Sequence, residues 1–240
     1  MASDTNSVSD EIKNEIKKVW KNKTGLERVK YFVYYYKVQF IVAVLAVVFI
    51  VSMAIDIANR KECVFQAMII NGEFEDRYDY DTFWTGFEDR LEYDKEKEEI
   101  KMDSSIHVNL EEQDQTSQML VQKVFLNVST QDLDVIVCDE SFMRLTRAQH
   151  CLYDFRDLLS EEQMAKYEDK LVWYDNPVEE VGEDASYVGE VEALCIDVSD
   201  SKKIKEGNMF PYTDGKAYLM IFGNSTHADK ALDFLEYLDE

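Results

Sequence analysis

The residues best suited to chemistry follow an apolar run in the sequence QDLDVIVCDE, residues 131–140. Cys138, Asp139 and Glu140 stand next to each other there, a thiol beside two carboxylates. Such a group could serve as a nucleophile, a metal site or a ligand-binding patch, because ligands gather at the carboxyl ends of strands in open α/β sheets. In a simpler structural interpretation, the apolar residues fill a core strand and the carboxylates favour the positive end of the next helix.

The chemistry of the thiol favours the structural interpretation. A reactive thiolate needs a positive neighbour, whereas adjacent carboxylates raise the pKa of a thiol such as Cys138. The sequence has no recognisable pairing of nucleophile and base, so we predict no catalytic residue and no enzymatic activity. A hypothesis of small-ligand binding is kept for polar residues at the ends of predicted strands, namely Asn71, Asp139, Glu140 and Ser141.

The residue types that bind metals do not form a recognisable site. His107, His150 and His227 lack the spacing of metal ligands. Residues 73–81, EFEDRYDYD, carry five carboxylates, and calcium binds such oxygen ligands. Because the residue order of an EF-hand loop is absent, we predict a solvated acidic loop leading into a helix, with calcium binding as the alternative. No metal and no cofactor is expected.

Four cysteines raise the question of disulfides. Cys63 and Cys138 are expected at opposite ends of parallel strands, too far apart to form a disulfide. Cys195 falls in the middle of a predicted strand, which is a core position. We therefore predict free and mostly buried thiols.

An apolar segment divides the chain into two parts that differ in charge. Residues 38–55, VQFIVAVLAVVFIVSMAI, would span roughly 27 Å as a helix, close to the thickness of a bilayer core. Eight basic residues precede it within residues 1–37. The positive-inside bias predicts a cytoplasmic leader (1–37), a transmembrane signal anchor (38–57) and an extracytoplasmic domain (61–240) in the cell membrane. The alternative is a signal peptide cleaved after the small-x-small sequence of residues 52–54.

The leader contains two helix signals. Ile12, Ile16, Val19 and Trp20 recur at helical spacing among lysines, which is typical of a basic amphipathic helix that lies on an anionic membrane surface. Residues 24–27, TGLE, match a capping box that opens a second helix running into the membrane.

The outer part is strongly acidic. Residues 61–240 carry 17 basic and 43 acidic side chains, a net charge of −26. Such a surface repels nucleic acid, whose binding depends on Lys and Arg. Its apolar content is too high for a disordered acidic tail, and its length is sufficient for one core. Residues 175–190 are the best candidate for a long acidic loop.

Hydrophobic periodicity predicts alternating strands and helices in this domain. The expected strands cover residues 63–70, 100–110, 133–138, 191–198 and 217–222. The expected helices cover residues 81–93, 116–128, 141–149, 161–167 and 227–238. This order predicts an α/β fold, a single three-layer lobe with a mostly parallel sheet and helices on both faces.

Three segments resemble the extracellular solute-binding proteins of bacterial importers, which have the type II periplasmic-binding-protein fold. They are residues 116–138, a helix followed by QDLDVIVC; residues 152–167, LYDFRDLLSEEQMAKY; and residues 217–238, AYLMIFGNSTHADKALDFLEYL. The resemblance implies the family's scaffold over most of residues 63–240. The whole layout also resembles uncharacterised membrane proteins of anaerobic (clostridial-type) Gram-positive bacteria.

The chain departs from that family in one important respect. A full member has two lobes that close around a ligand, whereas here about twenty residues separate the strand at 191–198 from the returning strand at 217–222. The chain therefore corresponds to one lobe, without an interdomain cleft. We predict a membrane-anchored, non-enzymatic binding module with a protein partner in the membrane or envelope. The alternative is a degenerate single-lobe solute-binding protein that holds a small ligand at the carboxyl ends of its strands, with a transporter as a candidate neighbour.

Overall fold

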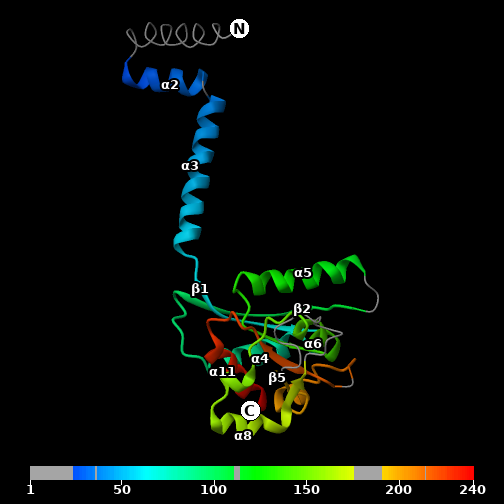
Figure 1. Ribbon diagram of the computed structural model, residues 1–240. Coiled ribbons are helices and arrows are strands. Elements are labelled where there is room, and N and C mark those ends of the chain that lie inside the picture. The colour runs from blue at the N-terminus through cyan, green and yellow to red at the C-terminus, as the bar shows by residue number, and fades with distance from the viewer. Residues whose placement is uncertain (1–23, 36, 111–113, 176–190, 214) are drawn as a thin grey trace. The chain divides into compact units, whose positions relative to one another are not determined.

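The computed structural model describes residues 24–35, 37–110, 114–175, 191–213 and 215–240. The chain divides into two compact units, Met1–Arg60 and Lys61–Glu240. Figure 1 traces both units along the chain from blue to red. The second unit contains the sheet and the core, and it positions every candidate site residue.

The first unit contains the helices α2 (Gly25–Tyr35) and α3 (Lys37–Ala58). Glu27 accepts hydrogen bonds from the backbone N–H and the hydroxyl of Thr24, at 3.1 and 3.0 Å, so the expected cap at the start of α2 is present. α3 has 22 residues and contains a window of 18 with a mean hydropathy of 2.9, so it is long and apolar enough to cross a membrane. The amphipathic helix expected around Ile12 and Ile16 lies outside the described residues.

The second unit is an α/β domain with one six-stranded sheet in the order β2-β1-β3-β6-β5-β4. The strands are β1 (Glu62–Ile70), β2 (Glu98–Ile106), β3 (Val135–Cys138), β4 (Leu171–Tyr174), β5 (Glu192–Asp197) and β6 (Tyr218–Ile221). β1 pairs in parallel with β2 and β3, whereas the β3–β6, β6–β5 and β5–β4 pairs are antiparallel. The α/β class is confirmed, but the expectation of a mostly parallel sheet was wrong, because the sheet is mixed.

The connections explain the antiparallel half of the sheet. Neighbouring parallel strands need a crossover of a dozen or more residues, usually a long helix, as α4 (Arg77–Glu88) provides between β1 and β2. Between β5 and β6, the residues that the structure describes form the five-residue helix α10 (Lys202–Glu206) and turns but no long helix, and β6 pairs directly back onto β5. The sequence patterns missed both α10 and β4. Of the predicted acidic loop, residues 176–190 lie outside the described residues.

Successive residues of the central strands point to opposite faces, and each face has its own core. One cluster joins Phe65, Ala67 and Ile69 of β1 to α4, α7 (Phe155–Leu158), α8 (Glu161–Tyr167), α10 and α11 (Ala228–Asp239). The other joins Met68 and Ile70 to α5 (Gln115–Ser129) and α6 (Glu140–Arg147). Figure 1 shows α5 on one side of the sheet and α4, α8 and α11 on the other. Helices therefore cover both faces, as expected.

Candidate functional site

The carboxyl ends of β1, β2 and β3 meet at one edge of the sheet. Ile70, the last residue of β1, pairs with Ile106 of β2 and with Cys138 of β3. Asn71 and Asp139 therefore leave the sheet side by side. We call this rim, from which the polar residues after β1, β2 and β3 project, the carboxyl edge.

Asn71 joins the three strand ends through its side chain. Its backbone is left-handed, with φ of 61°. Its amide Nδ2 donates to the Val108 carbonyl oxygen at 3.0 Å and to Asp139 Oδ2 at 2.9 Å, while its Oδ1 accepts from the Val108 backbone N–H at 2.6 Å. Every polar atom of this side chain therefore has a partner within the protein.

Asp139 is the buried cap of α6. Its Oδ1 accepts from the backbone N–H of Phe142 at 2.9 Å, and the hydroxyl of Ser141 donates to the same carboxylate at 3.0 Å. With the bond from Asn71, the charge is surrounded by donors, and the helix dipole stabilises it as well. Of the four residues predicted to bind a ligand, the structure thus brings together Asn71, Asp139 and Ser141.

Glu140 is the exception among the four. It lies on the exposed side of α6 and accepts from Arg144 Nε at 3.1 Å, one helical turn away. It is not among the residues that line the pocket described next.

Two neighbouring pockets open at the carboxyl edge. The first, which we call the β3 pocket, has a volume of about 460 Å³ and is lined in part by Asn71, Val108, Asp139, Ser141 and Tyr212. The second, the β2 pocket, has a volume of about 620 Å³ and lies against the end of β2 and the first turn of α4. Its lining includes Arg77, Tyr80, Asp103, Ser104 and Ser105. Glu73 and His107 line both pockets.

The β2 pocket has its own charge pairing. Burial acts to raise the pKa of Asp103, but hydrogen bonds from Ser105 and Lys123 outweigh it and lower that pKa below its usual value. The Lys123 ammonium lies 2.9 Å from Asp103 Oδ2. Tyr80 donates its hydroxyl proton to the Met102 carbonyl oxygen at 2.9 Å and packs edge-on against Phe74. These groups stabilise the walls of the pocket.

Cys138 is a core residue. It is fully buried, and burial followed by the neighbouring charge of Asp139 raises the pKa of the thiol well above its usual value. No thiolate forms at neutral pH under these conditions. The structural interpretation of the Cys138-Asp139-Glu140 sequence, a strand end followed by a helix cap, is confirmed.

The other three cysteines are also free thiols. Cys195 is buried in β5, and burial raises the pKa of its thiol to about 12. Cys63 and Cys151 are partly exposed, and burial raises the pKa of both. Cys63 lies near the start of β1 and Cys138 at the end of β3, so the expected separation along the strands is confirmed.

Several acidic side chains of the domain cap helices. In the stretch 73–81, Asp76 accepts from the Asp79 backbone N–H at 3.0 Å and begins α4, so the expected loop into a helix is present. Among the residues that the structure describes, no group of three or more His, Cys, Asp or Glu side chains could hold a metal ion.

One buried polar cluster was missed by the sequence patterns. Asp134 lies at the amino end of β3 and accepts from the Gln66 backbone N–H at 2.8 Å and from the Ser225 hydroxyl at 2.6 Å. His227 Nδ1 lies 3.3 Å from the same carboxylate. This set has the residue types of a hydrolase triad, but Ser225 donates to the carboxylate instead of the imidazole, so the histidine is not in position to activate it. The three polar residues were visible in the sequences QDLDV (131–135) and NSTH (224–227), but nothing in the sequence showed that these two segments lie in contact.

The chain matches no protein-family model, no curated protein and no solved structure. The resemblance to solute-binding proteins therefore stays a prediction that rests on the three segments of the sequence.

Proposed function

We propose that this chain is a single-pass membrane protein whose acidic domain, outside the cytoplasm, binds a protein partner without catalysing a reaction. The single observation that carries the binding function is the closed hydrogen-bond network of the carboxyl edge. Asn71 and Asp139 bond to each other and to the surrounding backbone, so the polar groups that could hold a small ligand are already paired. The carboxyl edge therefore offers a contact surface for a protein rather than unpaired polar groups for a small ligand.

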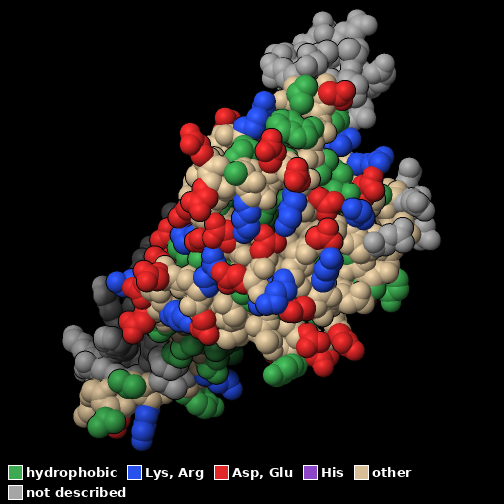
Figure 2. All heavy atoms as spheres, turned by 90° about the horizontal axis from the view of Figure 1, so that it is seen from below, with side chains coloured by type: hydrophobic (Ala, Val, Ile, Leu, Met, Phe, Trp, Pro, Cys, Tyr) green, Lys and Arg blue, Asp and Glu red, His purple; other side chains and the backbone are tan. Residues whose placement is uncertain are grey.

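Two exposed tyrosines favour a protein partner at this edge. Tyr212 lines the β3 pocket and is 81% exposed, and Tyr78, in the first turn of α4 beside the β2 pocket, is 75% exposed. Tyrosine is enriched in the centres of protein interfaces because it offers a large rigid surface and a polar tip. Since the domain carries a net charge of −26, the partner surface should be basic. On the face seen in Figure 2, Asp and Glu side chains are interspersed with Lys and Arg.

Membrane anchorage rests on the length and composition of α3 and on the charge asymmetry around it. The test uses chains in which Cys63 and Cys151 are replaced by Ser. In intact cells, a membrane-impermeable maleimide should label Glu161→Cys in the acidic domain and leave Thr24→Cys unlabelled until the cells are opened. Labelling of Thr24→Cys in intact cells would contradict the orientation, and release of the domain from washed membranes would show a cleaved anchor.

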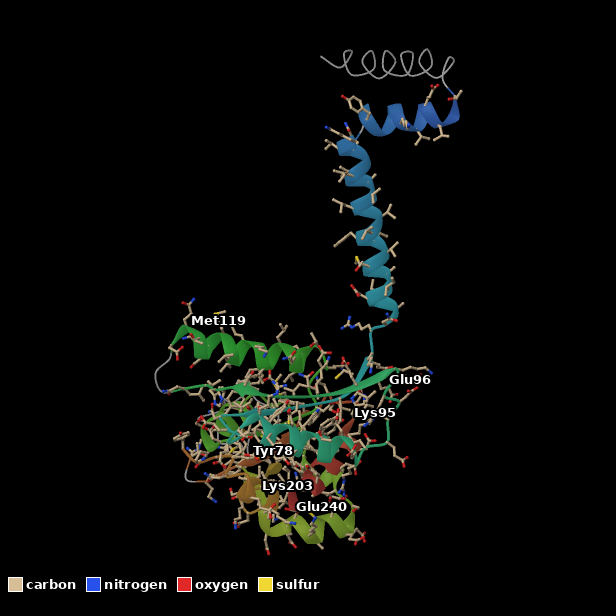
Figure 3. The ribbon with its side chains drawn as sticks, turned by 180° about the vertical axis from the view of Figure 1, so that it is seen from behind. Tyr78, Lys95, Glu96, Met119, Lys203 and Glu240 are labelled. Atoms are coloured by element: carbon tan, nitrogen blue, oxygen red, sulfur yellow. The ribbon has the colours of Figure 1, made fainter. Side chains whose placement is uncertain are left out.

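A photoreactive amino acid in place of Tyr212 tests the partner. Glu96, before β2 at the opposite edge of the sheet, is the matched control, and Figure 3 labels it beside Lys95. In native membranes, irradiation should give one adduct of constant mass with the Tyr212 variant and none with the Glu96 variant. High salt should weaken the adduct if the partner is basic. Equal adducts from both positions, or none from either, would refute a specific partner at the carboxyl edge.

A second candidate function follows from the volume of the β3 pocket. At about 460 Å³ it is large enough for a small molecule. In this alternative, the domain is a single solute-binding lobe, and Asn71, Asp139 and Ser141, which line the β3 pocket, face the ligand. A ligand that raises the melting temperature of the wild-type chain but not of Ser141→Trp, which fills the pocket, would favour this alternative.

A further inference from the structure

We propose that the chain forms a homodimer in the membrane through its helix α5, which packs antiparallel against α5 of a second copy about a two-fold axis. The inference goes beyond partner binding and uses only the membrane anchor of the proposed function. Its basis is the outward face of α5.

The first observation is the charge of this helix. Residues 115–131 contain no Asp or Glu, although the domain carries 43 acidic side chains. Among the helices that the structure describes between residues 61 and 240, α5 alone lacks an acidic residue. Its one cation, Lys123, pairs with Asp103 of β2 at 2.9 Å. Two strongly acidic domains repel each other, and a contact through α5 brings no Asp or Glu of this helix against the second copy.

The second observation is an exposed apolar stripe on the same face. Met119 is 62% exposed and Leu126 is 64% exposed, although both are large apolar side chains. They lie seven residues apart, so they share one side of the helix with Gln122 between them. Figure 3 shows Met119 on the side of α5 that faces away from the sheet. The opposite side of the helix contributes Val124 and Val128 to the core.

The third observation is the symmetry of the stripe. The midpoint between Met119 and Leu126 falls at the centre of Gln115–Ser129. An antiparallel pair of α5 helices therefore places Met119 against Leu126 of the second copy, twice, and Gln122 near the axis. A two-fold interface needs such self-complementarity. A glutamine amide both donates and accepts, so two copies of Gln122 can bond to each other.

Other occupants fit this face less well. Helices that bind anionic membrane surfaces carry many Lys and Arg on their polar side, whereas α5 has one lysine, already paired. A basic partner would gain nothing from a neutral face. A helix of about 22 Å buries less area than a stable soluble dimer needs. Anchoring both copies in one membrane raises their effective concentration and compensates for the small area.

Disulfide crosslinking of the full-length chain in proteoliposomes tests the dimer. Cys63 and Cys151 are first replaced by Ser, and Gln122→Cys is introduced near the proposed axis. The matched control is Glu161→Cys on α8, which packs on the other face of the sheet through Met164. Mild oxidation should give a covalent dimer with Gln122→Cys and none with Glu161→Cys. Leu126→Glu, added to the Gln122→Cys chain, should lower the yield about tenfold, because the contact would bury unpaired carboxylates.

Each further outcome decides the question. Equal yields from the two cysteine positions would refute the α5 contact. The same experiment in native membranes would refute it if the Gln122→Cys adduct had the mass of a different protein. A lipid-dependent blue shift of a fluorophore on Gln122→Cys, without a dimer, would assign the face to the membrane instead. An unchanged melting temperature of Leu126→Glu shows that the loss of crosslinking is not unfolding. No partner protein is present in proteoliposomes, so the absence of an α5 crosslink there would not contradict partner binding at the carboxyl edge. Likewise, the absence of a photoadduct at Tyr212 would not contradict the α5 dimer.

Discussion

Asn71 follows β1 in a left-handed backbone conformation, and its side chain bonds to residues from two other segments of the chain, Val108 after β2 and Asp139 after β3. Asparagine tolerates this conformation better than most residues because its short amide bonds to nearby backbone groups. The amide also donates to Asp139, the cap of α6, so one side chain fixes the ends of β1 and β3 and the loop after β2. At the residue scale, the carboxyl edge is rigid before any partner arrives.

Substitutions of Asn71 separate the backbone contribution from that of the side chain. Asn71→Gly should lower the free energy of unfolding by about 1–3 kcal/mol, because the Val108 groups and Asp139 lose a partner. Asn71→Ala should cost about 1 kcal/mol more, since alanine also resists the left-handed conformation. Urea unfolding of the two variants and the wild-type chain measures both differences. Equal stability of the Gly and Ala variants would show that the backbone at residue 71 is not left-handed.

The buried carboxylate of Asp134 gives a second prediction at this scale. Asp134→Ala should destabilise the domain by about 2–4 kcal/mol, because it leaves the Gln66 backbone N–H without a buried acceptor. Asp132→Ala, two residues earlier on an exposed turn, is the matched control and should change stability by less than about 1 kcal/mol. Thermal unfolding of both variants tests the ranking. A large effect of Asp132→Ala with a small effect of Asp134→Ala would overturn it.

The sequence predicted the site at the level of strand ends but not at the level of contacts. The apolar run before Cys138 indicated that Asp139 follows a strand, and helix capping accounted for its charge. The pairing with Asn71 depends on the register between β1 and β3, a contact 68 residues apart along the chain. The Asp134–Ser225 bond joins residues 91 apart. Hydrophobic periodicity describes residues that are close along the chain. Contacts between residues this far apart can be predicted only when the order of the strands in the sheet is known.

At the element scale, hydrophobic periodicity identified most helices and strands but did not show which strands run antiparallel to their neighbours. The strands β3 and β6 are short and fully buried, and such an apolar run looks the same whether its neighbour is parallel or antiparallel. The connection decides, and the described residues between β5 and β6 form the five-residue helix α10 instead of a long crossover helix. β4 was missed because its apolar run, LVWY, is only four residues long and directly follows α8 and a short 3-10 turn, so periodicity cannot separate it from the end of a helix.

The packing of α4 against α11 yields a prediction for this scale. A Cβ atom on Gly86 would lie 2.5 Å from Tyr237 Oη, whose hydroxyl donates to the Phe83 carbonyl oxygen at 2.6 Å. Alanine stabilises a helix by about 1 kcal/mol relative to glycine. The clash with the tightly packed ring of Tyr237 should cost more than this gain. Gly86→Ala should therefore destabilise the domain by about 1–3 kcal/mol.

Tyr237→Phe provides the matched background for this test. It removes the clashing oxygen, and the next ring atom, Cζ, would lie 3.4 Å from the new Cβ, an ordinary contact distance. Gly86→Ala should then be neutral or stabilising, so a double-mutant cycle should give a coupling of at least about 1 kcal/mol. Additive effects of the two substitutions would show that Gly86 does not face Tyr237.

At the scale of the whole acidic domain, several carboxylates are held ionised by specific partners. In Asp103, Asp154, Asp197 and Asp239, burial acts to raise the pKa, but hydrogen bonds and nearby cations outweigh it, so each pKa is lowered. Asp239 near the C-terminus accepts from Ser201 at 2.8 Å and pairs with Lys166 and Lys170. Asp233, in contrast, has a pKa raised by burial.

The sign of these shifts sets the response of stability to pH. Where the folded pKa is lowered, the unfolded chain binds protons first as the pH falls, so stability present at neutral pH is lost below about pH 4. Asp239→Asn should cost about 1–3 kcal/mol at pH 7 and should make the loss below pH 4 shallower. Asp233→Asn, the control, should stabilise the domain at pH 7 because it removes a partly buried charge. Melting temperatures between pH 7 and pH 3 measure these effects. If the melting temperature of Asp239→Asn falls with pH as steeply as that of the wild-type chain, Asp239 does not contribute to the pH dependence.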